Sequence, residues 1–123
     1  EDQTIKIYGD GAQKRDYIYI DDIVEAFMLA GVNPAADGEI YNVGSGTGER
    51  FIDMAKLVVK VVGQGKIEMV PWPGNYAIIE SGDYFSDISK IRKAFGWQPK
   101  ISLQEGIART FEYYQKYRDH YWQ

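Results

Sequence analysis

The sequence contains no cysteine and a single histidine, His120, which lies three residues from its carboxyl end. The lack of cysteine excludes a disulfide framework, a thiolate zinc site and a cysteine nucleophile. A Ser-His-Asp hydrolase has no support, because no G-x-S-x-G motif surrounds Ser45. The motif G-x-x-x-x-G-K-[ST] is also missing, which excludes a P-loop nucleotide hydrolase. Histidine and carboxylate residues do not cluster as a metal site requires, so we expect no bound metal.

Long apolar runs are missing as well. The longest stretch without strongly polar residues, 26–32, is far shorter than the roughly 20 residues of a bilayer-spanning helix. No basic-then-apolar leader opens the chain. Acidic residues outnumber basic ones by 18 to 14, and the net charge of −4 has the wrong sign for binding a phosphate backbone. We therefore expect a soluble, cytoplasmic protein without a membrane or nucleic-acid partner.

The apolar pattern predicts short strands that alternate with helices. Polar and apolar residues alternate over 4–8, which predicts a strand. Further short strands are predicted at 16–20, which is rich in Tyr and Ile, at 39–43 and at 67–70. Apolar residues at intervals of three and four predict four helices, at 23–30, at 51–62, at 89–95 and from Ser102 onward. This order is typical of a layered α/β fold. We predict one small mixed α/β domain of about four helices and short strands over residues 1–123.

Polar side chains mark the starts of two predicted helices. Asp21 and Asp22 could be paired acid/base carboxylates, but carboxylates at a helix start accept unpaired N–H groups, and we favour capping. Asp22 with Glu25 resembles a capping box. Ser102 and Glu105 form a clearer S-x-x-E box. Side-chain caps are therefore predicted for the first and the last helix.

The loop 44–48 carries three glycines between a predicted strand and a predicted helix. A dinucleotide site would need G-x-G-x-x-G, but Glu49 and Phe51 stand where the third glycine would have to be. No strand that ends in an acidic residue follows at the required distance. We favour a structural strand-to-helix turn, with anion contact through its free N–H groups as the alternative.

Arg15 follows a turn that contains two glycines and precedes a predicted strand. A fixed backbone there could aim its guanidinium at a pyrophosphate, because arginine offers a planar fork of donors. The alternative is a surface arginine paired with Asp10 or Asp16. The residue types alone leave this choice open.

Aromatic residues gather near two helices. Tyr84 and Phe85 lie between the irregular stretch 74–82 and the start of a predicted helix. They could stack on a nucleobase, but a place in the core is favoured. The tyrosine-rich tail that includes Tyr117 and Tyr121 is interpreted as core or interface.

Several blocks of the sequence together resemble one enzyme family. The blocks are Ile7–Gly11 with Gln13, Arg15–Asp22, Ile40–Gly46, Asp87–Lys90 and Gly96–Pro99. In this order and at this approximate spacing they resemble the extended short-chain dehydrogenase/reductase family, which includes nucleotide-sugar epimerases and dehydratases. The likeness covers essentially the whole chain.

The resemblance implies the carboxy-terminal half of such an enzyme. The family has an amino-terminal NAD-binding half and a smaller half that grips the nucleotide diphosphate of the sugar donor. The cofactor loop G-x-x-G-x-x-G is missing here, and no lysine has a tyrosine four residues before it, so the catalytic Y-x-x-x-K is missing too. The chain also opens at Glu1 rather than at a methionine. We therefore expect the substrate-binding part of an extended Rossmann-type enzyme, inactive by itself, with NAD bound by the missing half.

The resemblance also implies which residues bind the substrate, a nucleoside-diphosphate sugar. Arg15 matches the family arginine that contacts the diphosphate. Lys6 and Tyr8 match the segment beside the nucleobase, and Tyr84 matches a position near the nucleotide. None of these four residues is expected to be catalytic or to bind the cofactor.

Two departures from the family pattern are visible. Many relatives carry a second phosphate-binding arginine before the segment that matches Tyr84, but 75–83 contains no basic residue, so diphosphate binding is expected to be weaker or differently arranged. Relatives often cap the helix after the glycine loop with Ser or Thr. Arg50 stands there instead, which leaves Thr47 or water to satisfy the helix N–H groups.

The resemblance implies a sugar-nucleotide enzyme, with the exact reaction open. A UDP-glucose 4-epimerase-like enzyme is the first interpretation. A dTDP-glucose 4,6-dehydratase-like enzyme is the alternative within the family. A non-catalytic binding or interaction module with the same fold is the alternative from another class.

Overall fold

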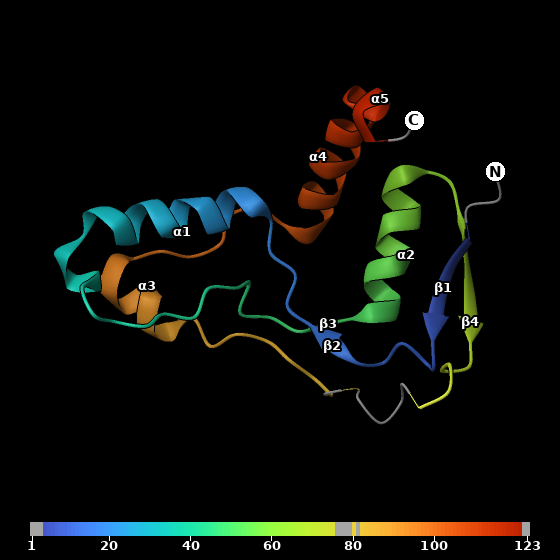
Figure 1. Cartoon of the computed structure of the whole chain (residues 1–123), viewed down its shortest axis with the longest axis horizontal. Coiled ribbons are helices and arrows are strands. Elements are labelled where there is room, and N and C mark those ends of the chain that lie inside the picture. The colour runs from blue at the N-terminus through green and yellow to red at the C-terminus, as the bar shows by residue number, and fades with distance from the viewer. Residues whose placement is uncertain (1–3, 76–79, 81, 122–123) are drawn as a thin grey trace.

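The computed structural model describes residues 4–75, 80 and 82–121, which form short strands alternating with helices. Strands β1 (Thr4–Tyr8) and β4 (Lys66–Val70) pair in parallel over their whole lengths, with Tyr8 opposite Val70. Helix α2 (Phe51–Val62) directly precedes β4 and lies beside this sheet (Figure 1). The strands predicted at 4–8 and 67–70 and the α/β fold class are confirmed.

A second pair of strands is much shorter. β2 (Lys14–Arg15) and β3 (Glu49–Arg50) pair antiparallel, with Arg15 opposite Glu49. The strands predicted at 16–20 and 39–43 are wrong, since neither range forms a strand. The alternating residues Ile18, Tyr41 and Val43 pack against the main core from backbone outside any sheet. The apolar residues in these two ranges therefore indicate packing on the core and not pairing with a neighbouring strand.

The predicted helices are confirmed, and a short one is added at the end. Besides α2 the helices are α1 (Ile20–Val32), α3 (Ser89–Phe95), α4 (Leu103–Lys116) and α5 (Arg118–Tyr121), and a 3₁₀ turn covers Pro34–Ala36. α1 begins at residue 20 instead of 23. Figure 1 shows α1 and α3 at one end of the molecule and α2 with β1 and β4 at the other.

The main core lies between α1 and α3. Ala26, Ile88, Ile91 and Trp97 form its buried cluster, and burial of their apolar surface is the main force that holds this end together. At the other end of the molecule, Ile7 of β1 is fully buried. The fold therefore has apolar contacts at both ends, with β2 and β3 between them (Figure 1).

Asp22 does not cap α1, so that prediction is wrong. The residue before the helix is Tyr19, which makes no side-chain cap. Asp22 is instead 2% exposed, and its carboxylate accepts the backbone N–H groups of Lys100 and Ile101, both at 3.1 Å. Glu25 does not complete a capping box, because its carboxylate pairs with the Lys100 ammonium. Asp22 therefore joins α1 to the segment that leads into α4.

The predicted cap of α4 is confirmed for Ser102. Its hydroxyl accepts the N–H of Glu105 at 3.2 Å. The Glu105 carboxylate pairs with Arg109 one turn later, so the contact that the structure gives it points along the helix. The cap therefore consists of the serine bond.

We expect Ser102→Ala to lower the free energy of unfolding by about 1 kcal/mol, the usual cost of removing a serine cap. The measurement is the urea midpoint, with an unchanged slope of the transition. Gln104→Ala, at an exposed position in the first turn of the same helix, is the matched control and is expected to change stability by less than about 0.5 kcal/mol. Equal losses in both variants would contradict the cap.

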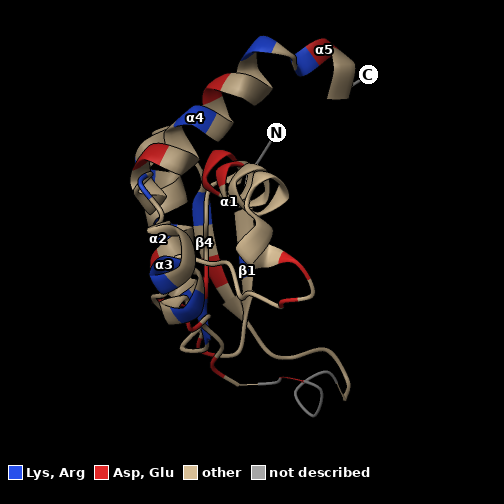
Figure 2. Cartoon of the chain, turned by 90° about the vertical axis from the view of Figure 1, so that its left-hand side faces the viewer, with Lys and Arg blue, Asp and Glu red and all other residues tan. Residues whose placement is uncertain are grey.

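Charges are mixed along the last long helix. Basic and acidic residues are interspersed along α4, whereas the first turn of α1 carries acidic residues alone (Figure 2). α4 therefore offers no continuous basic stripe. In the described part of the chain, no helix is long and apolar enough to cross a membrane.

Candidate functional site

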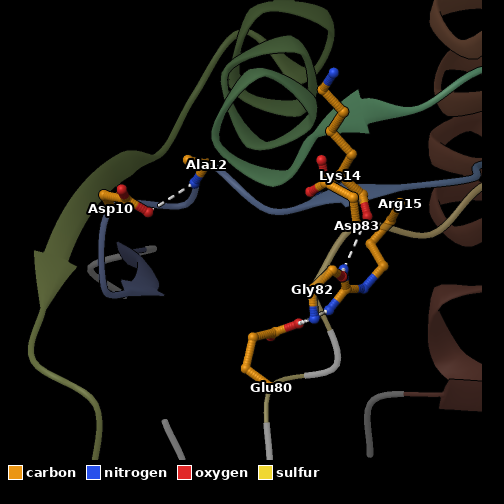
Figure 3. A network of polar contacts seen from close by, with 7 residues as sticks. All are labelled: Asp10, Ala12, Lys14, Arg15, Glu80, Gly82 and Asp83. Atoms are coloured by element: carbon orange, nitrogen blue, oxygen red, sulfur yellow. Dashed lines mark hydrogen bonds and ion pairs between the residues drawn. The ribbon is translucent and has the colours of Figure 1, made fainter.

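Arg15 stands on β2, and its guanidinium is held by a segment far along the chain (Figure 3). Nη1 donates to the carbonyl oxygens of Lys14 at 2.8 Å and Gly82 at 2.6 Å. Nη2 forms an ion pair with the Glu80 carboxylate. The Arg15 side chain stays 29% exposed. Its fork of donors is therefore fixed in direction, and the side chain that carries it is partly exposed.

Neither Asp10 nor Asp16, the two partners named in the ion-pair alternative, pairs with Arg15. Asp10 accepts the N–H of Ala12 at 2.9 Å, within its own turn. Asp16 accepts backbone N–H groups from two other loops, described below. Glu80, 65 residues after Arg15, is the partner. No local pattern pointed to it.

Backbone bonds fix the segment that contacts Arg15 onto β2. The N–H of Lys14 donates to the Asp83 carboxylate at 2.8 Å, and the N–H of Tyr84 donates to the Lys14 carbonyl at 3.1 Å. The backbone of Tyr84 therefore lies next to β2, the strand that carries Arg15. Its side chain is 59% exposed and that of Phe85 54%, so the favoured core placement of these two residues is wrong.

Lys6 and Tyr8 lie on β1, away from the buried face of that strand. Ile7 between them is fully buried, whereas Lys6 is exposed and Tyr8 is 42% exposed. Tyr8 stacks on Trp72, with ring centroids 5.7 Å apart and planes inclined by 26°. Sequence analysis missed Trp72. Gly9 makes room for this indole, because a Cβ there would lie 2.4 Å from the indole nitrogen of Trp72, but that contact is visible only in the structure.

The structure therefore groups the predicted site residues in two places. Arg15 lies on β2 and the backbone of Tyr84 bonds to its neighbour Lys14, while Lys6 and Tyr8 share β1, whose Tyr8 end leads into the glycine turn before β2. Ligands commonly bind at the carboxyl ends of parallel strands, and Tyr8 and Trp72 stand at that end of β1 and β4. The turn is the covalent link between the two groups.

Backbone carbonyls of the glycine turn before Arg15 cap the start of α2. Phe51 N–H donates to the Gln13 carbonyl and Ile52 N–H to the Gly11 carbonyl, both at 3.0 Å. These carbonyls take the place of a side-chain cap for two N–H groups of the first turn of α2, and Thr47 does not supply one. Gly11 has φ +62°, and a Cβ on it would lie 2.8 Å from the Ile7 side chain, which explains why glycine is required. α2 therefore helps to fix the backbone that carries Arg15.

The loop 44–48 is a structural turn, as favoured. The N–H groups of Ser45 and Gly46 donate to the Asp16 carboxylate at 2.7 and 3.4 Å, and Ser86 N–H donates to it at 2.9 Å. A Cβ on Gly44 would lie 2.3 Å from the same carboxylate. The anion that these N–H groups bind is thus the protein's own. The loop does not fit the pyrophosphate of a dinucleotide.

The surroundings of Asp16 favour its charged carboxylate, the form that accepts these N–H groups. Burial acts to raise the pKa of its carboxyl group, but hydrogen bonds from Ser45, Ser86 and Gly46 outweigh burial and lower the pKa below its usual value. The charged form is therefore the one that the fold stabilises. Asp16 directly follows Arg15, so its hydrogen bonds connect the end of β2 to the glycine loop and to the segment after Tyr84.

A large groove lies next to the segment 16–19, which follows β2. It has a volume of about 1030 Å³ and is lined by residues 16–19 together with α2 and α4. The Tyr17 hydroxyl is buried there without a hydrogen-bond partner among the described residues, and burial raises the pKa of Tyr17. Arg15 does not line this groove. In the described residues no three metal-ligating side chains cluster.

Comparison with known proteins gives a consistent result. The family model described as GDP-mannose 4,6 dehydratase matches residues 1–110. The UDP-glucose 4-epimerase of Mycolicibacterium smegmatis is 36% identical over 115 residues, which cover 91% of this chain and 34% of that protein. The family-model match includes all four predicted site residues, Lys6, Tyr8, Arg15 and Tyr84.

Two solved structures have the same fold over this length. The epimerase Mth375 from Methanothermobacter thermautotrophicus matches with a TM-score of 0.86 and 30% identity, over 95% of this chain and 34% of that one. The UDP-glucose 4-epimerase of Thermotoga maritima, solved with UDP-glucose, matches with a TM-score of 0.76 and 33% identity, over 94% of this chain and 36% of that one. The chain thus spans about a third of the length of these relatives.

Proposed function

This chain belongs to the GDP-mannose 4,6 dehydratase family of nucleotide-sugar epimerases and dehydratases, within the extended short-chain dehydrogenases/reductases, and from that membership we propose its function. It is the substrate-binding part of a UDP-glucose 4-epimerase-like enzyme. The observation that carries this proposal is the fixed guanidinium of Arg15, on a partly exposed side chain of β2, the strand to which the backbone of Tyr84 is bonded. A planar fork of donors in that setting suits a diphosphate.

Each site residue has a part in this proposal. Arg15 binds the diphosphate. Tyr8, supported by Trp72, borders the nucleobase with its half-exposed ring, and Lys6 lies on the same side of β1. Tyr84 contacts the nucleotide near Arg15. Together they bind and orient the substrate.

The hydride chemistry belongs to a part of the protein outside this chain. The loop 44–48 gives its N–H groups to Asp16 and does not fit NAD, and the chain has no Y-x-x-x-K motif. We propose that NAD and the catalytic tyrosine are supplied by an amino-terminal half, the partner of this chain in one longer protein. The 123-residue chain alone is then inactive.

A turnover assay tests the proposed reaction. The full-length protein is incubated with NAD and either UDP-glucose or dTDP-glucose, and the products are separated. Conversion of UDP-glucose to UDP-galactose is expected. A 4-keto-6-deoxy sugar product would instead support the dehydratase, a second candidate that the description of the matched family favours. If the full-length protein binds these substrates and converts neither, a non-catalytic binding module remains.

A further inference from the structure

Glu80 is paired with the Arg15 guanidinium, the group to which the proposed function assigns binding of the diphosphate. Its carboxylate pairs with Nη2 of Arg15 and also accepts the N–H of Gly82 at 3.2 Å (Figure 3). The Glu80 side chain is 23% exposed and that of Arg15 29%, so the pair is partly screened from water. The charge of the guanidinium is therefore balanced inside the chain.

The remaining donors of Arg15 are few. Nη1 carries two N–H groups, and the carbonyl oxygens of Lys14 and Gly82 accept from it. Nη2 also carries two N–H groups, and one of them pairs with the Glu80 carboxylate. Among the described residues, the Nε N–H and the second N–H of Nη2 are therefore left for a ligand. A phosphate oxygen that binds these two donors lies beside the Glu80 carboxylate, and the two anions repel each other at the same guanidinium.

We propose that Glu80 is an internal competitor for Arg15, whose negative charge opposes binding of the substrate diphosphate, so that Glu80 sets the affinity of the site. This inference rests on the proposed role of Arg15 in diphosphate binding. Glu80 is then an affinity-determining residue that has no contact with the reacting sugar. Its removal strengthens binding, whereas removal of a residue that contacts the ligand weakens it.

Glu80→Gln is the test variant, because glutamine keeps the length of the side chain and an acceptor for Gly82 N–H while it removes the charge. Calorimetric titration of the full-length protein uses UDP, dTDP and GDP in turn. The variant is expected to bind the nucleotide about two- to fivefold more tightly, the range that partly exposed ion pairs contribute. Glu39→Gln, which removes the same charge from the exposed pair with Lys90, is the matched control and is expected to leave the affinity unchanged.

The same substitution in an Arg15→Ala background separates the two proposals. If competition for Arg15 is the cause, Glu80→Gln has no effect once Arg15 is gone. Equal tightening in both backgrounds, or unchanged or weaker binding of Glu80→Gln in the presence of Arg15, overturns the inference. If Arg15→Ala itself binds like the parent protein, the proposed role of Arg15 fails, and the inference fails with it.

Discussion

Arg15→Ala is expected to weaken binding of a nucleoside diphosphate by about 1.5 to 3 kcal/mol, the usual contribution of a charge-assisted hydrogen bond. In dissociation constants this is roughly a 10- to 150-fold loss. The reason is the loss of the one guanidinium that β2 and the segment 82–84 hold in a fixed direction. The measurement is calorimetric titration of the full-length protein with UDP and dTDP.

Arg50→Ala is the matched control for this loss. Arg50 stands on β3, opposite Lys14, and pairs with Asp53 at 2.6 Å on the exposed side of α2. Its removal takes away the same charge from a neighbouring strand and is expected to leave binding unchanged. Equal losses in both variants would mean that net charge, and not the fork of Arg15, attracts the diphosphate. Unchanged binding in Arg15→Ala would contradict the proposed function.

Local sequence patterns predicted the helices and the parallel strands because these elements depend on neighbouring residues. The apolar stripe of α2 and its left-handed Gly63, and the serine cap of α4, are all signals within a few residues. The strand predicted at 39–43 failed for a different reason. Tyr41 and Val43, separated by the polar Asn42, are apolar because they pack on the main core, and no strand among the described residues pairs with them.

Long-range polar contacts could not be predicted from the sequence. Asp22 stands where a cap would stand, but its acceptor oxygens serve N–H groups that lie 78 and 79 residues away. Arg15 has acidic residues nearby in the sequence, but its partner is Glu80. In each case several groups satisfy the same chemistry, and only the packing of distant segments decides between them. The residue types of the candidate site were therefore predictable, while their partners were not.

Asp16→Ala is expected to have the largest effect on stability, about 3 kcal/mol. Three backbone N–H groups, those of Ser45, Gly46 and Ser86, lose their acceptor, and a partly buried N–H without a partner costs roughly 1 to 3 kcal/mol. The measurement is the urea midpoint. Asp21→Ala is the control, because Asp21 forms a single exposed pair with Arg109 at 3.6 Å and is expected to contribute about 0.5 kcal/mol or less.

The pH dependence of this effect identifies its cause. Since the pKa of Asp16 is lower in the folded protein than its usual value of 3.8, its contribution is complete above that value and is lost as pH falls through the folded pKa. Asp16→Asn keeps the shape of the side chain without the charge and is expected to show a smaller loss than Asp16→Ala. The stability difference between the parent protein and Asp16→Asn should therefore shrink between about pH 5 and pH 2. A difference that stays constant over this range would mean that the shape of the Asp16 side chain, and not its charge, holds the two loops beside Arg15.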